Sequence, residues 1–365
     1  MSKFEFEAFR PGFIFNPVEP EKEARLCYRK VECRIPTRVG TFLVWPARFA
    51  HPSKIGVYDV GLIDFCVGAY TKADVSLIEG NEIEIHPSVE RPLVASHAAE
   101  IIRKTIGKTD IGLLVDVHNE FKVKHGGLAS TSSTQHSVAY AVNKLFGEPL
   151  SSRQLMRYLP QNYGEEAVKP GMLAMEPSTG GVGAVCLSGG GIVVLRGETE
   201  VIGQMKVPEN FVYVLGIPSI DREDYAADIA VIIQELFPLY EELDKKWGGV
   251  KERIIDDIVL PAMRRKDIWT VGQAIFDYTL NRYGDIQKSF DLLCPGLKMS
   301  EMMQSLDQLC PNREVITAFV SGGGPGLVIL TSNPDIAEEH FRSLGIETIH
   351  YFPPDNTGVT FQCFK

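Results

Sequence analysis

The chain has 365 residues, of which 44% are hydrophobic and 23% are charged, an ordinary composition for a soluble globular protein with room for two domains. Its formal net charge of −10 argues against a general nucleic-acid or anionic-membrane surface, although a local basic pocket could still bind an anionic substrate. We expect neither a transmembrane helix nor a signal peptide, because no apolar run is long enough and the first residues lack a hydrophobic segment.

The seven cysteines are scattered along the chain and form no CxxC pair. An odd number of isolated cysteines is typical of reduced thiols in a cytoplasmic protein, and their spacing does not suit a zinc site. We therefore expect a cytoplasmic protein without zinc.

Prolines interrupt residues 1–30, so this segment is expected to be an extension without regular elements. Alternating apolar and polar residues then predict a series of short strands, and a helical pattern predicts a helix near 92–106. The strands are expected at 31–35, 40–44, 62–69, 73–78 and 82–86.

A strand expected over 110–123 leads into a loop of glycine, alanine and hydroxyl side chains, which opens into a helix ending near 147. Ser132, Ser133 and Thr134 stand where the N-cap of that helix is expected. Such a loop points several N–H groups outward at the positive end of the helix dipole, which suits a phosphate or pyrophosphate. A glycine-rich turn that only caps a core helix is the alternative left open by the local pattern.

Further elements follow as a helix at 151–159, a loop at 160–180, a helix or turn with a strand over 183–197, and a buried strand at 211–218. Helices and strands then mix without a regular βαβα alternation, which favours an α+β protein with two domains. The helices are expected at 223–243, 250–265, 267–283, 299–309 and 334–344, and the strands at 315–320, 327–331 and 359–364. We place an N-terminal extension at 1–30 and the two domains at 31–206 and 207–365.

Two more glycine-rich segments stand out, VSGGGPGLVIL at 320–330 and PSTGGVGAVCLSGGGIVVLRG at 177–197. The first joins two apolar strands, and its turn is longer than a hairpin needs, which suits a wall placed against a ligand. A plain hairpin turn is the structural alternative. Most glycines of the second segment are explained by tight turns and close backbone packing.

In this order the glycine-rich segments resemble the GHMP kinase superfamily, which includes galactokinase, homoserine kinase, mevalonate kinase and phosphomevalonate kinase. GGLASTSS at 126–133 resembles the central phosphate loop of that superfamily, and residues 320–330 resemble its C-terminal Ser-Gly-x-Gly-Pro motif. Residues 35–39, Ile-Pro-Thr-Arg-Val, resemble its N-terminal Ala-Pro-x-Arg motif. The resemblance covers about residues 31–331 and implies a two-domain α+β GHMP kinase-like fold. Its phosphate loop opens a helix in the N-terminal domain, and its C-terminal domain is ferredoxin-like.

Within the superfamily the chain is more similar to β-ribofuranosylaminobenzene 5′-phosphate (β-RFAP) synthase than to the kinases. His125, Gly127, Leu128, Ser130, Thr134 and Gln135 follow the order of the synthase loop, with two extra residues before Thr134. Residues 260–275 also resemble the Leu-Pro-Ala helix pair of the synthase.

The sequence departs from the motif of the synthase at one place and from that of mevalonate-type kinases at another. Gly323-Gly324 stands where the synthase carries an aromatic residue, which is more kinase-like. Mevalonate-type kinases carry a catalytic aspartate where this chain has Val182 and Gly183. Homoserine-type kinases also lack that aspartate, so kinase activity stays open.

The resemblance implies a decarboxylating phosphoribosyltransferase. Such an enzyme makes a C-riboside 5′-phosphate from phosphoribosyl pyrophosphate and an aromatic or heteroaromatic carboxylic acid, with Mg2+, and releases CO2 and pyrophosphate. The alternative is an ATP-dependent small-molecule kinase of the homoserine kinase kind, with an alcohol as acceptor. A non-catalytic nucleotide sensor is a third interpretation. Small molecules are thus the expected partners, with neither nucleic acid nor membrane, and a homodimer is one possible assembly.

Arg38, Asp64 and His125 are the candidate catalytic residues. Arg38 could grip a phosphate or carboxylate with its planar guanidinium, and a salt bridge to Asp64 is its structural alternative. Asp64 is a candidate base or ribose-hydroxyl acceptor, with an edge-strand salt bridge as its alternative. His125 could donate a hydrogen bond to a phosphate, with a turn histidine that faces solvent as its alternative. His136 is expected at the surface.

The phosphate or pyrophosphate is expected to contact the central loop and the C-terminal glycine turn. The hydroxyls of Ser133 and Thr134 are also expected to hold Mg2+, indirectly or through the phosphate. The expected phosphate-binding residues are Lys124, Gly126, Gly127, Leu128, Ala129, Ser130, Thr131, Ser132, Ser133, Thr134, Gln135, Ser321, Gly322, Gly323 and Gly324.

Overall fold

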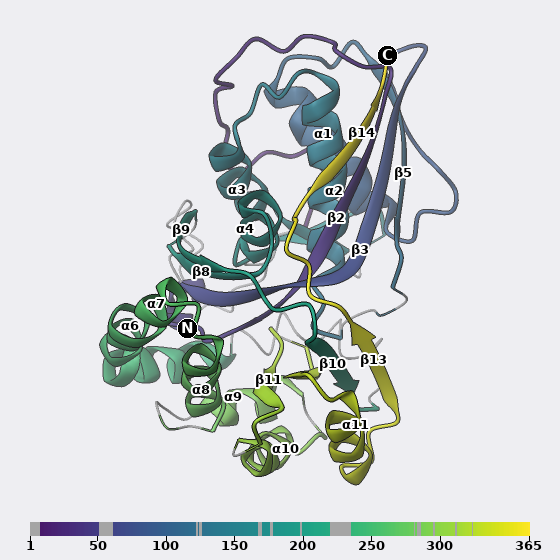
Figure 1. The fold of residues 1–365 in the computed structure, drawn as a ribbon. Helices are drawn as coiled ribbons and strands as arrows, with labels where there is room; N and C mark the ends of the chain where they lie inside the picture. The colour runs from purple at the N-terminus through teal and green to yellow at the C-terminus, as the bar shows by residue number, and fades with distance from the viewer. Residues whose placement is uncertain are drawn as a thin grey trace.

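The chain folds into two stacked halves, each built on its own β-sheet (Figure 1). The computed structural model describes residues 8–365 except 51–60, 122, 124–125, 167–169, 176–177, 198, 220–234, 281, 283–285, 295, 311 and 323. Among these residues, no helix is both long and apolar enough to cross a membrane.

The N-terminal half is a seven-stranded, mainly antiparallel sheet with helices packed against it. Its central strands run in the order β14-β2-β3-β5-β4, and β8 pairs with both β3 and β9. The strands are β2 (Lys30–Thr41), β3 (Leu62–Ile78), β4 (Ile83–Ile85), β5 (Gly112–Asn119), β8 (Ile192–Arg196), β9 (Glu200–Met205) and β14 (Thr360–Phe364). The helices are α1 (Pro92–Thr105), α2 (Ser130–Leu145), α3 (Ser152–Gln161) and α4 (Gly181–Ser188).

Two long strands replace four expected short ones. The expected pairs 31–35 with 40–44, and 62–69 with 73–78, are each a single strand, β2 and β3. Pro36 lies between the first expected pair, and proline has no N–H to donate to a sheet. The sheet instead absorbs Pro36 through a shift in the register of β2 against β3 between Pro36 and Thr37.

The expected helices of this half are confirmed at α1, α2 and α3. α1 begins with Pro92 in its first turn, where a missing N–H costs nothing. Ser151 caps α3, and Gln154 completes a capping box with it. The segment 160–180, expected as loop, contains the short strands β6 (Gly164–Glu166) and β7 (Leu173–Met175), which form a small sheet with β1 (Ala8–Phe9).

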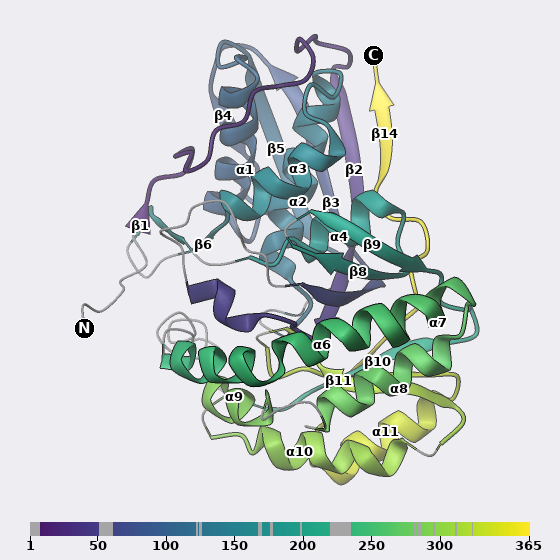
Figure 2. The ribbon, with the colours of Figure 1, turned by 90° about the vertical axis from the view of Figure 1, so that its left-hand side faces the viewer.

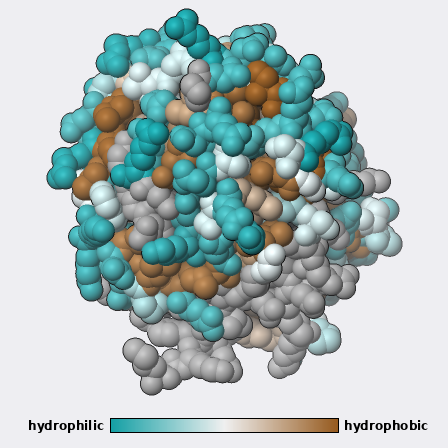
Figure 3. Space-filling model, turned by 90° about the horizontal axis from the view of Figure 1, so that it is seen from below, coloured by the Kyte–Doolittle hydropathy of each residue, from teal (hydrophilic) through white to brown (hydrophobic). Residues whose placement is uncertain are grey.

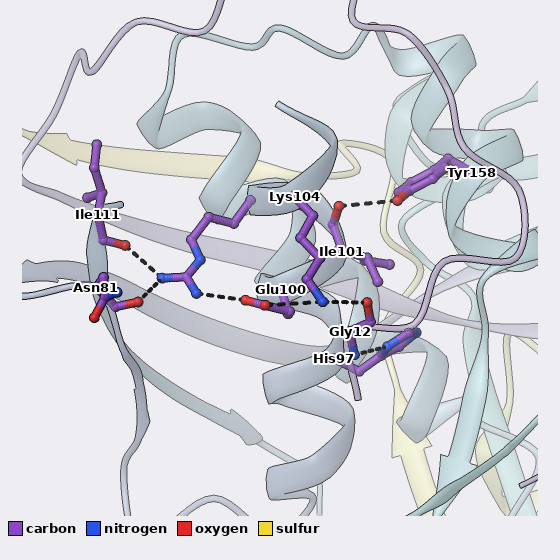
Figure 4. A network of polar contacts seen from close by, with 9 residues as sticks. Gly12, Asn81, His97, Glu100, Ile101, Lys104, Ile111 and Tyr158 are labelled. Atoms are coloured by element: carbon purple, nitrogen blue, oxygen red, sulfur yellow. Dashed lines mark hydrogen bonds and ion pairs between the residues drawn. The ribbon is translucent and has the colours of Figure 1, made fainter. Parts of the chain in front are cut away.

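The N-terminal extension lies along α1 and α3 and is held there by side chains (Figure 4). The Gly12 N–H donates to His97 Nδ1 at 3.0 Å, and Lys104 Nζ donates to the Gly12 carbonyl at 2.9 Å. Arg103 of the same helix donates to the carbonyls of Asn81 and Ile111. α1 therefore fixes both the extension and the loops beside it.

The C-terminal half is a four-stranded antiparallel sheet in the order β11-β12-β10-β13, with helices packed around it (Figures 1 and 2). Its strands are β10 (Val212–Ile217), β11 (Val315–Val320), β12 (Leu327–Thr331) and β13 (Thr348–Phe352). Its helices are α6 (Gly249–Ile254), α7 (Leu260–Arg264), α8 (Ile268–Thr279), α9 (Ile286–Leu293), α10 (Met299–Ser305) and α11 (Pro334–Ser343).

A long helical stretch precedes α8. Residues 235–243 are helical, and the π-helical turns Asp244–Gly248 and Ile255–Val259 flank α6. Most of the helix expected at 223–243 lies outside the described residues, whereas β9, β13 and α9 were not expected.

Seen from below, apolar patches alternate with polar side chains on the surface (Figure 3).

The two halves share one hydrophobic core. Phe65 of β3 stacks on Phe319 of β11 with ring centroids 5.1 Å apart, and both rings are fully buried. The last strand, β14, returns to the first half and pairs with β2 at the edge of its sheet (Figure 2). The expected boundary near Val207 stays a prediction, and the C-terminal strand crosses it.

Candidate functional site

The central loop enters α2 through a left-handed turn. Gly127 has φ +86°, and Ala129, which caps α2, has φ +50°. The helix begins at Ser130, so Ser132, Ser133 and Thr134, expected at its N-cap, lie inside it. No side chain caps it. The N–H groups of Leu128 and Ala129 have no acceptor in the described structure. The positive end of a 16-residue helix thus carries uncapped backbone donors.

Most side chains of the first turns of α2 face the protein interior. The Ser133 hydroxyl is fully buried and lies 3.1 Å from Thr37 Oγ1, and Thr134 Oγ1 donates to the Ser130 carbonyl. Gln135 donates to the carbonyls of Leu159 and Asn162. The hydroxyls of Ser133 and Thr134 are thus turned away from the loop surface, and the expectation that they hold Mg2+, indirectly or through the phosphate, stays a prediction.

Thr131 is also engaged with the fold, because its hydroxyl donates to Glu165 of β6. Gly127, Ala129 and Ser132 keep part of their surface exposed. The exposed side of the loop is therefore mainly backbone, whose free donors suit an anion.

The C-terminal glycine turn lies directly against the central loop. Ser321 Oγ donates to the Gly127 carbonyl at 2.6 Å and accepts from the Gly40 N–H at 3.3 Å. A Cβ on Gly324 would lie 2.5 Å from the Gly127 nitrogen, so only glycine allows this packing. The turn thus packs against the loop, and its expected role as a wall against a ligand stays a prediction. The Gly322 N–H donates to the Gly40 carbonyl, and Gly323 lies outside the described residues.

Arg38 and Asp64 form a buried ion pair beside this junction. Arg38 Nη1 lies 3.2 Å from Asp64 Oδ1, and Arg38 Nη2 donates to Thr179 Oγ1 at 3.1 Å. Asp64 is fully buried on the central strand β3, so the edge-strand alternative is wrong, but the salt-bridge alternative for both residues is present.

Two glycines make room for this pair. A Cβ on Gly40 would lie 2.1 Å from Arg38 Nη1, and a Cβ on Gly181 would lie 2.1 Å from Asp64 Oδ2. Gly181 opens α4, which has no side-chain cap. The carboxylate of Asp64 therefore lies at the positive end of a second helix.

The ion pair is poorly satisfied for a buried one. Burial raises the pKa of Asp64 to about 6, and the nearby Arg38 guanidinium opposes that rise. Among the described residues, neither carboxylate oxygen of Asp64 nor Arg38 Nε has a hydrogen-bond partner. Unsatisfied buried polar atoms are rare in stable interiors and mark a place where a ligand or water completes the network.

His136 lies inside the protein, so the expectation that it is at the surface is wrong. Its Nδ1–H donates to the Ser132 carbonyl at 2.7 Å, which leaves Nε2 as an acceptor without a partner. Burial lowers the pKa of His136 to about 4, and the charge of Arg38 adds to this effect. Ala139 and Tyr140, three and four residues later, lie on the same helix face and are buried. This spacing of apolar residues was the sign in the sequence that His136 faces inward.

Several predicted residues cannot be placed, and several site residues were missed. Lys124 and His125 lie outside the described residues. Sequence reasoning overlooked the contacts of Thr37 and Thr179, which no local motif marks. Within the described part of the chain, no group of three His, Cys, Asp or Glu side chains could hold a metal ion.

Comparison with known proteins shows the fold. No protein-family model and no curated protein matches the chain. Among solved structures, mevalonate pyrophosphate decarboxylase from Streptococcus pyogenes is 12% identical, with a TM-score of 0.63 over 93% of this chain and 99% of the other. Homoserine kinase from Cytophaga hutchinsonii is 16% identical, with a TM-score of 0.58 over 92% and 98%.

A third structure, mevalonate diphosphate decarboxylase from Enterococcus faecalis, concerns ATP binding mediated by mevalonate diphosphate. It is 14% identical, with a TM-score of 0.56 over 92% of this chain and 100% of the other. Similarity at these identities shows a shared architecture, and it confirms the expected α+β fold.

Proposed function

We propose, since the chain has the GHMP kinase fold, that it is an enzyme acting on a phosphate-bearing small molecule at the start of α2. The activity we propose is decarboxylating transfer from phosphoribosyl pyrophosphate to an aromatic or heteroaromatic carboxylic acid. The order of residues 125–135, which is similar to the loop of β-RFAP synthase, supports this choice among activities.

One observation carries the proposal: three glycine-rich segments, far apart in sequence, meet around the uncapped start of α2. Ser321 joins the C-terminal turn to the Gly127 carbonyl and the Gly40 N–H. Arg38, two residues before Gly40, donates to Thr179 near the start of the third segment, 177–197. Free backbone donors, a cation and a buried carboxylate thus lie in one region of the molecule.

The chemistry assigns a distinct role to each group. The bond between ribose C1 and pyrophosphate breaks, and its electron pair leaves with the pyrophosphate, which the N–H groups at the start of α2 stabilise. The ring carbon that bears the carboxylate bonds to C1, and the electrons of its bond to CO2 return to the ring. Asp64 offers negative charge to the developing cation at C1, and Arg38 binds an anionic group of either substrate.

Mg2+ suits the site only as an ion carried by the phosphates. Another solved structure of this fold contains AMPPCP together with magnesium. In this chain the described residues offer no carboxylate cluster, and Ser133 and Thr134 face inward, whereas Ser132 is partly exposed in the first turn of α2. Bound there, Mg2+ would neutralise negative charge on the leaving phosphate.

An ATP-dependent kinase is the second candidate, favoured by the state of Asp64. A carboxylate with a pKa of about 6, whose two oxygens accept no hydrogen bond among the described residues, can accept the proton of an acceptor hydroxyl near neutral pH. The mevalonate-type position at Val182 and Gly183 lacks an acid, but Asp64 reaches the same helix start from β3.

The deciding experiment supplies both pairs of substrates. The protein with Mg2+ is incubated with phosphoribosyl pyrophosphate and a panel of aromatic acids, and CO2 and pyrophosphate are measured. Parallel reactions contain ATP and candidate alcohols, and ADP is measured. We expect acid-dependent CO2 and pyrophosphate, whereas alcohol-dependent ADP without CO2 would establish the kinase instead.

Matched variants identify the groups that act. Asp64→Asn should abolish turnover with little change in substrate affinity, and Arg38→Lys should weaken affinity because it keeps the charge but loses the planar fork. Asp74→Asn, on the same strand but outside the site, is the control. A protein that binds nucleotide and forms neither product would be a sensor.

A further inference from the structure

We infer that Thr37 and Ser321 are positioning residues, whose hydroxyls hold two carbonyls of the central loop and so aim the N–H groups of Leu128 and Ala129 at the ligand. The inference rests on the proposed phosphate site. It adds Thr37 to the site and gives Ser321, which was expected to contact the phosphate, a role behind the loop instead. The two residues come from opposite halves of the molecule.

Ser321 has a fixed hydrogen-bonding direction. The Gly40 N–H can only donate, so Ser321 Oγ accepts it at 3.3 Å and uses its own proton for the Gly127 carbonyl at 2.6 Å. The side chain is fully buried. The C-terminal turn therefore pulls the carbonyl of Gly127 inward.

Thr37 does the same for the next peptide group from the other side. Its hydroxyl donates to the Leu128 carbonyl, so the Ser133 hydroxyl must donate to Thr37 Oγ1. Thr37 and Ser133 are both fully buried. A chain of two hydroxyls from α2 and β2 thus orients the second loop carbonyl.

Peptide geometry turns these two anchors into two aimed donors. In a trans peptide group the C=O and the following N–H point in opposite directions. With the carbonyls of Gly127 and Leu128 drawn into the protein, the N–H groups of Leu128 and Ala129 face away from it. Both N–H groups lack acceptors in the described structure.

This arrangement places the backbone of the loop under strain. Ala129 adopts a left-handed conformation that residues other than glycine rarely take, at φ +50° and ψ +39°. Strained backbone persists where surrounding contacts hold it, and it is concentrated at binding sites. The hydroxyls of Thr37 and Ser321 supply such contacts on the two peptide groups just before Ala129.

Affinity for pyrophosphate with Mg2+, measured by calorimetry, tests the inference. Thr37→Val and Ser321→Ala each remove one anchor, so each should weaken binding about tenfold or more, the loss of one charge-assisted hydrogen bond. Thr37→Ser keeps the hydroxyl and should bind normally. Thr317→Val removes another buried hydroxyl, one without a partner, and should also bind normally.

The outcomes separate this inference from the proposed function. Folded Thr37→Val and Ser321→Ala proteins that bind pyrophosphate normally would overturn the positioning role and leave the phosphate site intact. An unaltered protein that binds neither pyrophosphate, phosphoribosyl pyrophosphate nor ATP would overturn both.

Amide exchange gives a second measurement that needs no variant. The N–H groups of Leu128 and Ala129 should exchange more slowly in the unaltered protein when pyrophosphate is added. If either variant fails to fold, the exchange rates with and without pyrophosphate decide. The inference is overturned if the protein binds pyrophosphate and the exchange of both amides is unchanged.

Discussion

Asp64, a single residue, lowers the stability of the folded protein while it provides the carboxylate that the proposed chemistry needs. Its carboxylate is fully buried against Arg38 but accepts no hydrogen bond. A buried charge normally needs both a counter-ion and hydrogen bonds to offset its desolvation. Burial raises the pKa of Asp64 to about 6, and the Arg38 guanidinium 3.2 Å away offsets only part of that rise.

Replacing Asp64 should therefore change how stability depends on pH. The pKa of this carboxyl rises from 3.8 to about 6 on folding, so its contribution favours the folded state at low pH and is lost as pH rises through 6. The loss is about 3 kcal/mol. Relative to the unaltered protein, Asp64→Asn should gain about that much between about pH 4 and pH 7.

Urea unfolding across this pH range measures the difference. Asp244→Asn is the matched control, because burial also raises the pKa of Asp244 to about 6 but this residue lies outside the site. It should alter the pH dependence of stability and leave turnover unchanged. A constant difference between Asp64→Asn and the unaltered protein at all pH values would contradict the raised pKa.

Gly127 illustrates a residue that the fold and the ligand both require. If this glycine served only the close approach of a ligand, Gly127→Val would spare the stability of the free protein. The structure contradicts that view, because a Cβ there would lie 2.7 Å from the Ser321 carbonyl oxygen and φ is +86°. Gly127→Val should therefore weaken ligand binding and also lower the melting temperature.

Gly107→Val separates the two causes. Gly107 also has a positive φ, +66°, but no atom would contact a Cβ there, so its substitution costs only backbone strain, about 1–2 kcal/mol. Gly127→Val should destabilise the protein by more than this control in thermal unfolding. Equal losses of stability in the two variants would show that the contact with Ser321 is easily relieved.

β2 organises the site at the scale of elements. Within four residues it supplies Thr37 to the central loop, Arg38 to Asp64 and Thr179, and Gly40 to Ser321. The change of register between Pro36 and Thr37 occurs just before this run. Bulges are concentrated next to binding sites because they redirect the side chains that follow them.

The N-terminal extension is an element whose attachment should depend on pH. His97 accepts the Gly12 N–H at Nδ1 (Figure 4). It donates from Nε2 to the Asn162 carbonyl, so its neutral form is required. Burial lowers the pKa of His97 to about 4, from 6.5. A lowered pKa means stability that is present above pH 6.5 and lost as pH falls through 4, about 3 kcal/mol in all.

Hydrogen exchange at Gly12 measures this attachment. The amide should exchange faster as pH falls toward 4, after correction for the intrinsic pH dependence of exchange. His97→Gln, which does not titrate in this range, should remove that excess dependence. His340→Gln is the control, because His340 lies on α11 of the C-terminal half, where its Nε2 lies 3.2 Å from Ser305 Oγ. Exchange at Gly12 that depends on pH equally in His97→Gln would exclude this histidine as the cause.

The whole molecule depends on its last strand to unite its halves. β14 follows β13 of the C-terminal sheet and pairs with β2, the strand that carries the site. Phe65 and Phe319 join the same two halves through the shared core. The halves should therefore unfold together in one transition.

Removing residues 355–365 tests this dependence. The truncation exposes the edge of β2 and removes Asp355, which accepts the Tyr70 hydroxyl at 2.9 Å. We expect a lower melting temperature, measured by scanning calorimetry, and a tendency to aggregate, measured by light scattering. Thr360→Ala, which leaves the backbone pairing of β14 intact, is the control. A truncated protein as stable as the full chain would show that β14 is dispensable.

The sequence by itself determined the α+β class, the order of most helices and strands, and the three glycine-rich segments of the site. These follow from local causes: hydrophobic periodicity, capping residues, and the backbone freedom of glycine. The continuous course of β2 through Pro36 and the strand β13 depended instead on pairing with distant strands, so they were missed.

Only the tertiary structure decided what the side chains of the site do. Thr37 and Ser321 meet the central loop from positions 91 and 194 residues away from their loop partners, and no local pattern records such a contact. The burial of His136 and the inward direction of Ser133 likewise depend on which face of α2 the sheet covers. Periodicity gives the faces of a helix, but long-range packing selects the face that meets the ligand.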